Sequence, residues 1–138
     1  MMIETLKRGF NNGLATTYQL ARVVIPVYFI ITFLSHTPLL HVVSDFMSPL
    51  MKLVGLPGEA SLPLVLGFFL NIYAAIGAVL PLNLSIKEIT IIAAMLLMAH
   101  SLPMETAISK MTGVKVSFLV LARIILAFIL GAFFNLVM

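Results

Sequence analysis

Residues 55–60 read GLPGEA, and residues 100–106 read HSLPMET. Both segments contain Leu-Pro-x-Glu followed by a small residue, and apolar sequence lies on both sides of each segment. Proline and glycine disfavour a continuing helix. The two segments therefore predict helix breaks, at Pro57 and Gly58 in the first and at Pro103 in the second, each just before a new helix starts.

The sequence around these breaks is strongly apolar. Of the 138 residues, 62% are hydrophobic and 9% are charged, whereas soluble domains carry about 25% charged residues. This composition excludes a disordered chain and a water-soluble domain. Several apolar runs approach or reach the length of about 20 residues that crosses a bilayer as a helix. The sequence therefore predicts an all-α membrane protein with about four to five spanning or re-entrant helices.

Two regions of the chain differ in pattern. In residues 1–20, apolar side chains recur every three or four positions opposite charged and amide side chains, which predicts an amphipathic helix in the membrane interface. Residues 21–138 predict a single transmembrane domain. Within this domain, residues 39–54 are too polar to span alone and predict a short helix at the surface. The predicted spans are 21–37, 62–80, 86–99 and 116–138.

Missing residue types and motifs limit the function classes. The absence of cysteine excludes disulfides, thiolate metal sites and a cysteine nucleophile. The net charge of +3 is scattered, so we expect no nucleic-acid binding. No catalytic triad, phosphate-binding loop or catalytic carboxylate pair can be placed on the chain, so we expect no enzyme and no cofactor. His100 and Glu105 could contribute to a metal site, but two ligands are too few. A hydrogen-bonded structural role is the expected one for His100.

The two motif glutamates, Glu59 and Glu105, are candidates for a functional site. An ionisable group at membrane depth is costly, so it is normally paired or lines a polar cavity. Either glutamate could couple a cation or proton, or hydrogen-bond a solute. Either could also stabilise the N-terminus of the helix that follows it. The two roles are compatible.

Two further polar residues lie inside predicted spans. Asn71 is halfway along 62–80 in a seam of small residues, where it predicts a solute contact or a helix-packing hydrogen bond. Arg123 lies well inside the last span and predicts a carboxylate partner, Glu59 or Glu105. Snorkelling to the interface is the alternative for Arg123.

The motif-bearing strings resemble the nucleoside-recognition, or Gate, family. They are GLPGEA at 55–60 with LGFFLNIYAAI at 66–76, and LMAHSLPME at 97–105 with KMTG at 110–113. Members of that family include spore-maturation membrane proteins, and related domains occur in concentrative nucleoside transporters and ferrous-iron transporters. The resemblance covers roughly residues 20–135. It implies a transport-related membrane role without naming the solute, and family transporters carry two such units where this chain carries one.

We therefore expect a small secondary-transporter-like protein of the inner (cytoplasmic) membrane that recognises or translocates a small polar solute at the helix breaks. The alternative is a non-transporting assembly subunit of a larger membrane complex. The residues expected to line the site are Glu59, Asn71, His100, Ser101 and Glu105, with Arg123 as the counter-charge.

Lysine and arginine counts bear on orientation and partners. With the four predicted spans crossing, four of these residues lie on the side of the N-terminal region and three on the other. Such a weak bias permits both orientations, and it predicts an antiparallel homodimer that imitates an inverted repeat. A complex with a sister Gate protein is the other expected assembly. Ala127 and Gly131 predict a close helix contact, which favours oligomerisation.

Overall fold

The computed structural model describes residues 2–111 and 113–138, and this part of the chain contains helices and no strand. The predicted all-α fold class is confirmed. Three apolar segments are long enough to cross a membrane: Met2–Ser35, Ile86–Lys110 and Val116–Val137. The elements in chain order are α1 (Met2–Ser35), α2 (Pro38–Lys52), the 3₁₀ turn η1 (Gly58–Ala60), α3 (Ser61–Phe69), α4 (Ile72–Val79), α5 (Ile86–Met98), α6 (Leu102–Lys110) and α7 (Val116–Val137).

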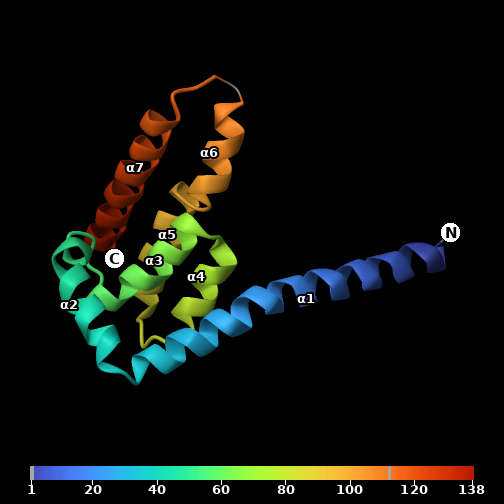
Figure 1. Cartoon of the computed structure of the whole chain (residues 1–138), viewed down its shortest axis with the longest axis horizontal. Coiled ribbons are helices and arrows are strands. Elements are labelled where there is room, and N and C mark those ends of the chain that lie inside the picture. The colour runs from blue at the N-terminus through green and yellow to red at the C-terminus, as the bar shows by residue number, and fades with distance from the viewer. Residues whose placement is uncertain (1, 112) are drawn as a thin grey trace.

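Helix α1 is continuous over 34 residues, with Pro26 inside it. Residues 2–19 are exposed, and this half of the helix extends away from the other helices (Figure 1). The C-terminal half packs against α4, where a Cβ on Gly77 would lie only 2.9 Å from the carbonyl oxygen of Val24. The helix has no break at residue 20, and the placement of residues 1–20 in the membrane interface stays a prediction.

The prediction of one unbroken span over 62–80 is wrong. Helix α3 ends at Phe69 and α4 begins at Ile72. Asn71 adopts an extended conformation, and its side-chain Oδ1 accepts a hydrogen bond from the amide of Ala74 at 2.9 Å. Asparagine is a preferred N-cap residue, so it starts a new helix here. The two short helices pack against each other as a hairpin, and α3, about 13 Å long, is too short to cross a bilayer.

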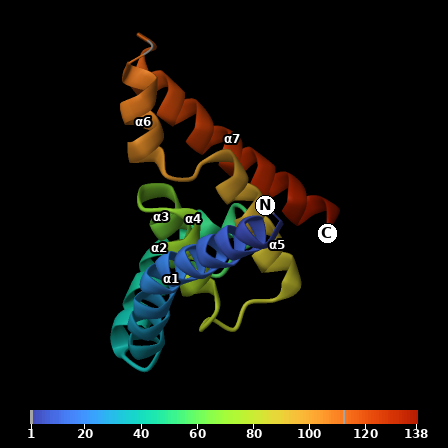
Figure 2. The same ribbon diagram turned by 90° about the vertical axis from the view of Figure 1, so that its right-hand side faces the viewer.

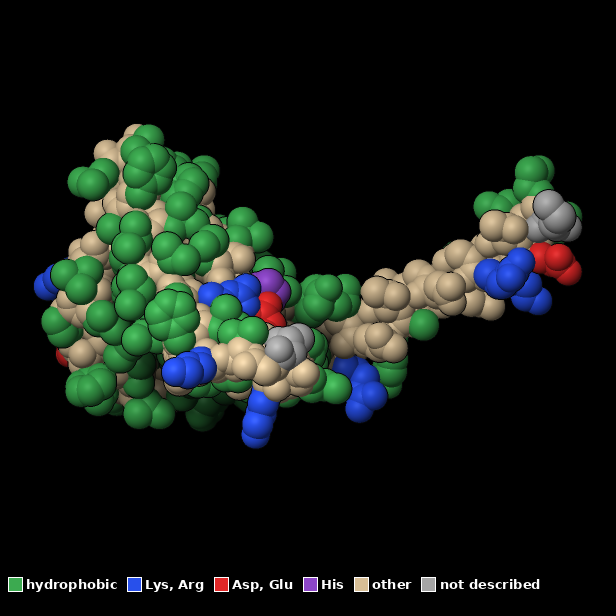
Figure 3. Space-filling model, turned by 90° about the horizontal axis from the view of Figure 1, so that it is seen from above, with side chains coloured by type: hydrophobic (Ala, Val, Ile, Leu, Met, Phe, Trp, Pro, Cys, Tyr) green, Lys and Arg blue, Asp and Glu red, His purple; other side chains and the backbone are tan. Residues whose placement is uncertain are grey.

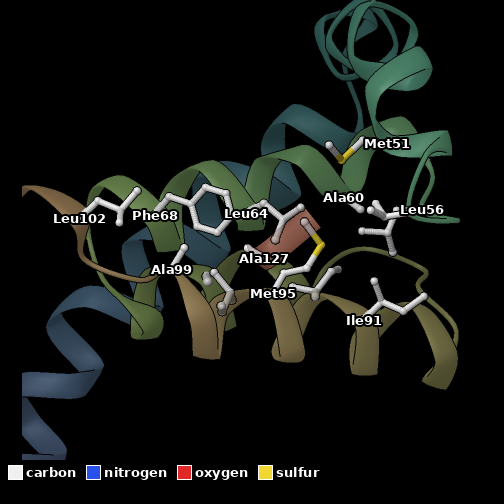
Figure 4. Close-up of a cluster of buried hydrophobic side chains, with 14 residues drawn as sticks. Met51, Leu56, Ala60, Leu64, Phe68, Ile91, Met95, Ala99, Leu102 and Ala127 are labelled. Carbon is white, nitrogen blue, oxygen red and sulfur yellow. The ribbon is translucent and has the colours of Figure 1, made fainter. Parts of the chain in front are cut away.

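The main core lies where α3, α5 and α7 meet (Figure 4). Met95 and Ala127 are fully buried in it. A Cβ on Gly131 would lie 2.8 Å from the Met95 sulfur, so α5 and α7 approach closely at this glycine. The close contact predicted at Ala127 and Gly131 therefore forms within one chain, and these two residues do not support a dimer.

One end of the domain is closed by polar contacts. Ser85 and Glu88 form the predicted capping box at the start of α5. Lys87 Nζ donates to the carbonyl of Asn135 near the end of α7, at 2.9 Å, and the Asn135 side chain lies against Gly55. We call this the Lys87 end. Lys110 and Lys115, at the connection between α6 and α7, lie at the opposite end, the Lys115 end (Figures 1 and 2).

Candidate functional site

The second motif interrupts the helical path between α5 and α6. Helix α5 ends at Met98, and Ser101 adopts the left-handed conformation (φ 49°, ψ 39°) before α6 begins at Leu102. Pro103 lies in the first turn of α6. An amide in this turn has no acceptor within the helix, so the N–H that proline lacks costs no helical hydrogen bond. The interruption therefore lies just before the proline, at residues 99–101.

This interruption touches the α3–α4 hairpin. The amide of Ser101 donates a hydrogen bond to the carbonyl of Gly67 at 2.9 Å, and Gly67 lies one turn before the reversal at Leu70 and Asn71. The Ser101 carbonyl in turn accepts from two amides in the first turn of α6, those of Met104 and Glu105. The tip of the hairpin and the α5–α6 interruption thus lie side by side. Backbone N–H and C=O groups that have no partner within a helix form hydrogen bonds with each other here.

An ionic cluster surrounds the interruption. The Arg123 guanidinium forms an ion pair with Glu105, and Arg123 Nε donates to the carbonyl of Met98, the last residue of α5, at 2.9 Å. His100 Nε2 lies 4.0 Å from Glu105 Oε1, and His100 Nδ1 lies 3.0 Å from the carbonyl of Leu96. Basic, histidine and acidic side chains lie side by side on the face shown in Figure 3. Glu105 is the carboxylate partner that the position of Arg123 predicts.

The cluster is partly open. The side chains of Glu105 and Arg123 are 29% and 28% exposed, and that of His100 is 39% exposed. A molecule can therefore reach the carboxylate and the imidazole without the cluster unfolding. The arrangement offers a carboxylate acceptor, a guanidinium donor and an imidazole within a few ångströms of one another, which suits hydrogen bonding to a polar solute.

The structure separates the first motif from this cluster. Glu59 lies in η1, at the opposite end of α3 from Gly67, and eight residues of helix correspond to about 12 Å. Pro57 precedes η1, and a Cβ on Gly58 would lie 1.9 Å from the carbonyl oxygen of Ser44. This segment therefore serves the close packing of η1 on α2.

Of the predicted site residues, the structure brings His100, Ser101, Glu105 and Arg123 together, with Asn71 at the adjacent hairpin tip. Glu59 lies apart from this cluster, at the other end of α3. Two contributors were not predicted, the backbone carbonyls of Gly67 and Met98. The reversal at Asn71 was also missed, although an asparagine in the middle of an apolar run is a recognisable capping signal. Within the described residues, no group of three or more His, Cys, Asp or Glu side chains is placed to hold a metal ion.

Comparisons of the sequence with known proteins show which family the chain belongs to. Residues 17–115 match the model of the Gate family, described as nucleoside recognition. The chain is 40% identical over 129 residues to the uncharacterized membrane protein YvoD of Bacillus subtilis (strain 168). That alignment covers 94% of this chain and 41% of YvoD, so the chain spans about two fifths of this relative. No solved structure matches the chain. The family match and the similarity over nearly the whole chain show that this membrane protein belongs to the Gate, or nucleoside-recognition, family.

Proposed function

We propose that the cluster of His100, Ser101, Glu105 and Arg123, with the adjacent Asn71, recognises a small polar solute and moves it across the inner membrane. The supporting observation is the Arg123–Glu105 ion pair beside two helix interruptions joined by the Ser101–Gly67 hydrogen bond. Interrupted helices in matched positions mark transport sites in membrane proteins.

The depth of the cluster supports this role. Arg123 lies seven residues after Val116, the start of α7, which is about 11 Å along the helix. The hydrocarbon core is about 30 Å thick. A charged pair at that depth is costly unless it serves a polar pathway or is fully paired, and this pair is still accessible at its edge.

The charges of the cluster favour an uncharged or weakly charged solute. Glu105 and Arg123 neutralise each other, and the hydrogen-bonding groups around them can receive hydroxyls, amides or ring nitrogens. The family description is nucleoside recognition, so uridine and adenosine are the first probes. Protonation of Glu105, or a cation bound to it, would weaken its bond to Arg123 and couple that ion to solute binding.

Transport is proposed to occur in a dimer, either of this protein or with a sister Gate protein. The helices in the described part of the chain offer few faces that could enclose a polar pathway. The alignment covers 41% of YvoD. The rest of YvoD is long enough to contain a second unit of this kind.

Uptake into proteoliposomes tests the proposal. Purified protein is reconstituted, and entry of labelled uridine and of labelled adenosine is measured with and without an imposed proton or sodium gradient. We expect Glu105→Gln to abolish gradient-driven uptake and the matched variant Glu4→Gln, on the exposed half of α1, to retain it. Equal uptake by both variants would reject the coupling role of Glu105.

The second candidate is a non-transporting assembly subunit. The exposed half of α1, residues 2–19, favours it, because such a helix can dock on a larger partner. This candidate requires stable co-purification with another membrane protein from native-like membranes and no solute flux by the reconstituted protein. Flux by the isolated protein excludes it.

A further inference from the structure

Two hydrogen-bond acceptors face each other in the ionic cluster, and the first belongs to His100. His100 Nδ1 lies 3.0 Å from the carbonyl oxygen of Leu96. A carbonyl oxygen can only accept a hydrogen bond, so Nδ1 carries a hydrogen and donates it. In a neutral imidazole the other ring nitrogen, Nε2, is then an acceptor. The backbone of α5 therefore sets the tautomer of His100.

The second acceptor belongs to Glu105. The distance from His100 Nε2 to Glu105 Oε1 is 4.0 Å, and the other carboxylate oxygen, Oε2, pairs with Arg123 Nη1. An ionised carboxylate has no hydrogen to donate. Among the described residues, no donor forms a hydrogen bond to Nε2 or to Oε1. We call these two atoms the acceptor pair. Because acceptors kept from water without a donor cost free energy, the pair is suited to a donor from another molecule.

The acceptor pair can be reached from outside the protein. The side chains of His100 and Glu105 are both partly exposed, and Figure 3 shows histidine, acidic and basic side chains together at the surface. A water molecule has two hydrogens and can bridge two acceptors. A solute with a matching donor group can take the place of such a water while the Arg123–Glu105 ion pair stays intact.

The surrounding charges favour an uncharged donor. Arg123 already neutralises Glu105, so a cationic donor would compete with the guanidinium for the same carboxylate. The other titratable groups on α3, α4, α6 and α7 are Tyr73 and Lys110, and neither supplies a second negative charge near neutral pH. A neutral N–H or O–H group therefore suits the acceptor pair better than an ammonium group.

The separation of the two acceptors favours a group with two hydrogens. A nitrogen placed about 2.9 Å from each acceptor would have the two atoms, 4.0 Å apart, at an angle of about 90°. An –NH2 group can donate to both with modest bending of each hydrogen bond. A hydroxyl has one hydrogen and pairs with one acceptor only. A carbonyl oxygen would add a third acceptor.

We propose that the acceptor pair of His100 and Glu105 binds an uncharged –NH2 group of the solute and discriminates against a carbonyl oxygen at the same position. The inference rests on the proposed function, which supplies nucleosides as probes. Cytidine carries an amino group where uridine has a carbonyl oxygen, and adenosine differs from inosine in the same way. Each of these nucleoside pairs therefore tests the contact on one sugar and one ring system.

Equilibrium binding to the purified protein in lipid nanodiscs tests the proposal. Dissociation constants are measured by calorimetry for cytidine, uridine, adenosine and inosine. We expect the amino member of each nucleoside pair to bind about tenfold more tightly than the carbonyl member, the effect of leaving acceptors unpaired at a part-exposed site. No gradient is imposed, so the result does not depend on transport or on ion coupling.

One variant and one control connect this preference to His100. The side-chain amide of His100→Gln can present either a donor or an acceptor, so we expect the members of each nucleoside pair to bind with similar affinity. His36 is exposed, follows α1 and makes the same kind of contact, from Nδ1 to the carbonyl of Thr32 at 2.8 Å. We expect His36→Gln to keep the full preference.

A second measurement determines the state of His100 without any solute. In protein with isotope-labelled histidine, the NMR signals of the ring nitrogens distinguish a nitrogen that carries hydrogen from one that does not. Near neutral pH we expect His100 to carry hydrogen on Nδ1 and none on Nε2. Loss of these signals in His100→Gln assigns them.

The outcomes separate this inference from the proposed function. Equal affinities within both nucleoside pairs, or tighter binding of uridine and inosine, would overturn the inference and leave the proposed function standing. An unchanged preference in His100→Gln, or a hydrogen on His100 Nε2 near neutral pH, would do the same. Failure of all four nucleosides to bind would reject nucleosides as the solute, and the inference with them.

Discussion

At the scale of single residues, Arg123 is the side chain that holds the α5–α6 interruption together. Its Nε satisfies the carbonyl of Met98 at the end of α5, and its guanidinium pairs with Glu105 in the first turn of α6. Lysine cannot reproduce this, because an ammonium group lacks the planar fork that reaches two acceptors from one position. The same contacts make the cluster a stability determinant as well as a candidate site.

Replacement of Arg123 is expected to destabilise the fold through Glu105. Arg123→Leu leaves a part-buried carboxylate without a partner, so we expect a loss of about 1–3 kcal/mol, less than for a fully buried pair because about a third of each side chain is exposed. The double variant Arg123→Leu/Glu105→Leu should recover part of that loss. Thermal unfolding in detergent measures both, with Arg8→Leu as the control. Strictly additive losses would mean that the pair contributes no coupling.

Ser101 is a residue of a different kind, because its backbone is the unusual feature. Among the described residues it is the one non-glycine with positive φ, and that conformation costs a residue with a Cβ about 1–2 kcal/mol. Strain of this kind is often retained at functional sites. At Ser101 the left-handed conformation lets the amide donate to the carbonyl of Gly67. It also lets the Ser101 carbonyl accept hydrogen bonds from amides in the first turn of α6.

Substitutions at Ser101 should follow backbone preference. Ser101→Gly is expected to leave stability unchanged or raise it by up to about 1 kcal/mol. Ser101→Val is expected to lower it by more than 1 kcal/mol, because a β-branched residue strongly disfavours positive φ. Ser117→Val, in regular helix, is the matched control. Melting temperatures in the same detergent decide the question, and equal tolerance of valine at 101 and 117 would contradict the role of the backbone.

At the scale of elements, the local signals at α5 and α6 were interpreted correctly from the sequence, whereas the capping signal at Asn71 was overlooked. The Ser85–Glu88 capping box and the proline of α6 depend only on residues within one helical turn. Such signals can be recognised from the spacing of residues in the sequence. The reversal between α3 and α4 lies in a stretch where nearly every residue is apolar, and hydropathy averaged over 62–80 cannot detect it. The hairpin is stabilised in part by a tertiary contact, the bond from Ser101 to Gly67, which local sequence does not encode.

The packing of η1 on α2 gives an element-scale prediction. A Cβ on Gly58 would lie 1.9 Å from the carbonyl oxygen of Ser44, so Gly58→Ala must move one backbone segment away from the other. We expect a loss of about 1–3 kcal/mol. Gly9→Ala is the control, since nothing lies within 4 Å of its added Cβ and alanine favours helix by about 1 kcal/mol. Chemical unfolding of the two variants compares them, and equal stability would mean that the α2–η1 contact relaxes freely.

At the scale of the whole molecule, the two motifs illustrate why a site is harder to predict than its residues. The first Leu-Pro-x-Glu segment comes just before α3 and the second forms the first turn of α6. Because α3 separates them, one carboxylate pairs with Arg123 and the other does not. The sequence pattern indicated which polar residues were unusual at membrane depth. The distances between these residues depend on how many segments cross the membrane. The α3–α4 hairpin replaces one predicted crossing segment, so the predicted distances changed.

The hairpin also changes which loops share a side. Because α3 and α4 enter and return, Lys52 and Lys87 both lie at the Lys87 end. The end of α1 packs near Leu82 at that same end, and its exposed half extends away from the other helices (Figure 1). If α1 crosses the bilayer, Lys7 and Arg8 lie on the same side of the membrane as the Lys115 end. With Arg22 left out because it lies inside α1, Lys7, Arg8, Lys110 and Lys115 then lie on one side of the membrane and Lys52 and Lys87 on the other. The linear count without Arg22 is three against three, so the hairpin gives the clearer bias.

This count predicts a single orientation, with the Lys115 end in the cytoplasm. Because the chain has no cysteine, Asn83→Cys and Met111→Cys report the two ends without background. A membrane-impermeant maleimide added to intact bacterial cells should label Asn83→Cys directly and Met111→Cys only after permeabilisation. A dimer of such chains would be parallel. Labelling of both variants in intact cells would contradict a single orientation and support insertion in both orientations. Two copies could then form the antiparallel pair, in which one copy's site faces the cytoplasm and the other's faces outward.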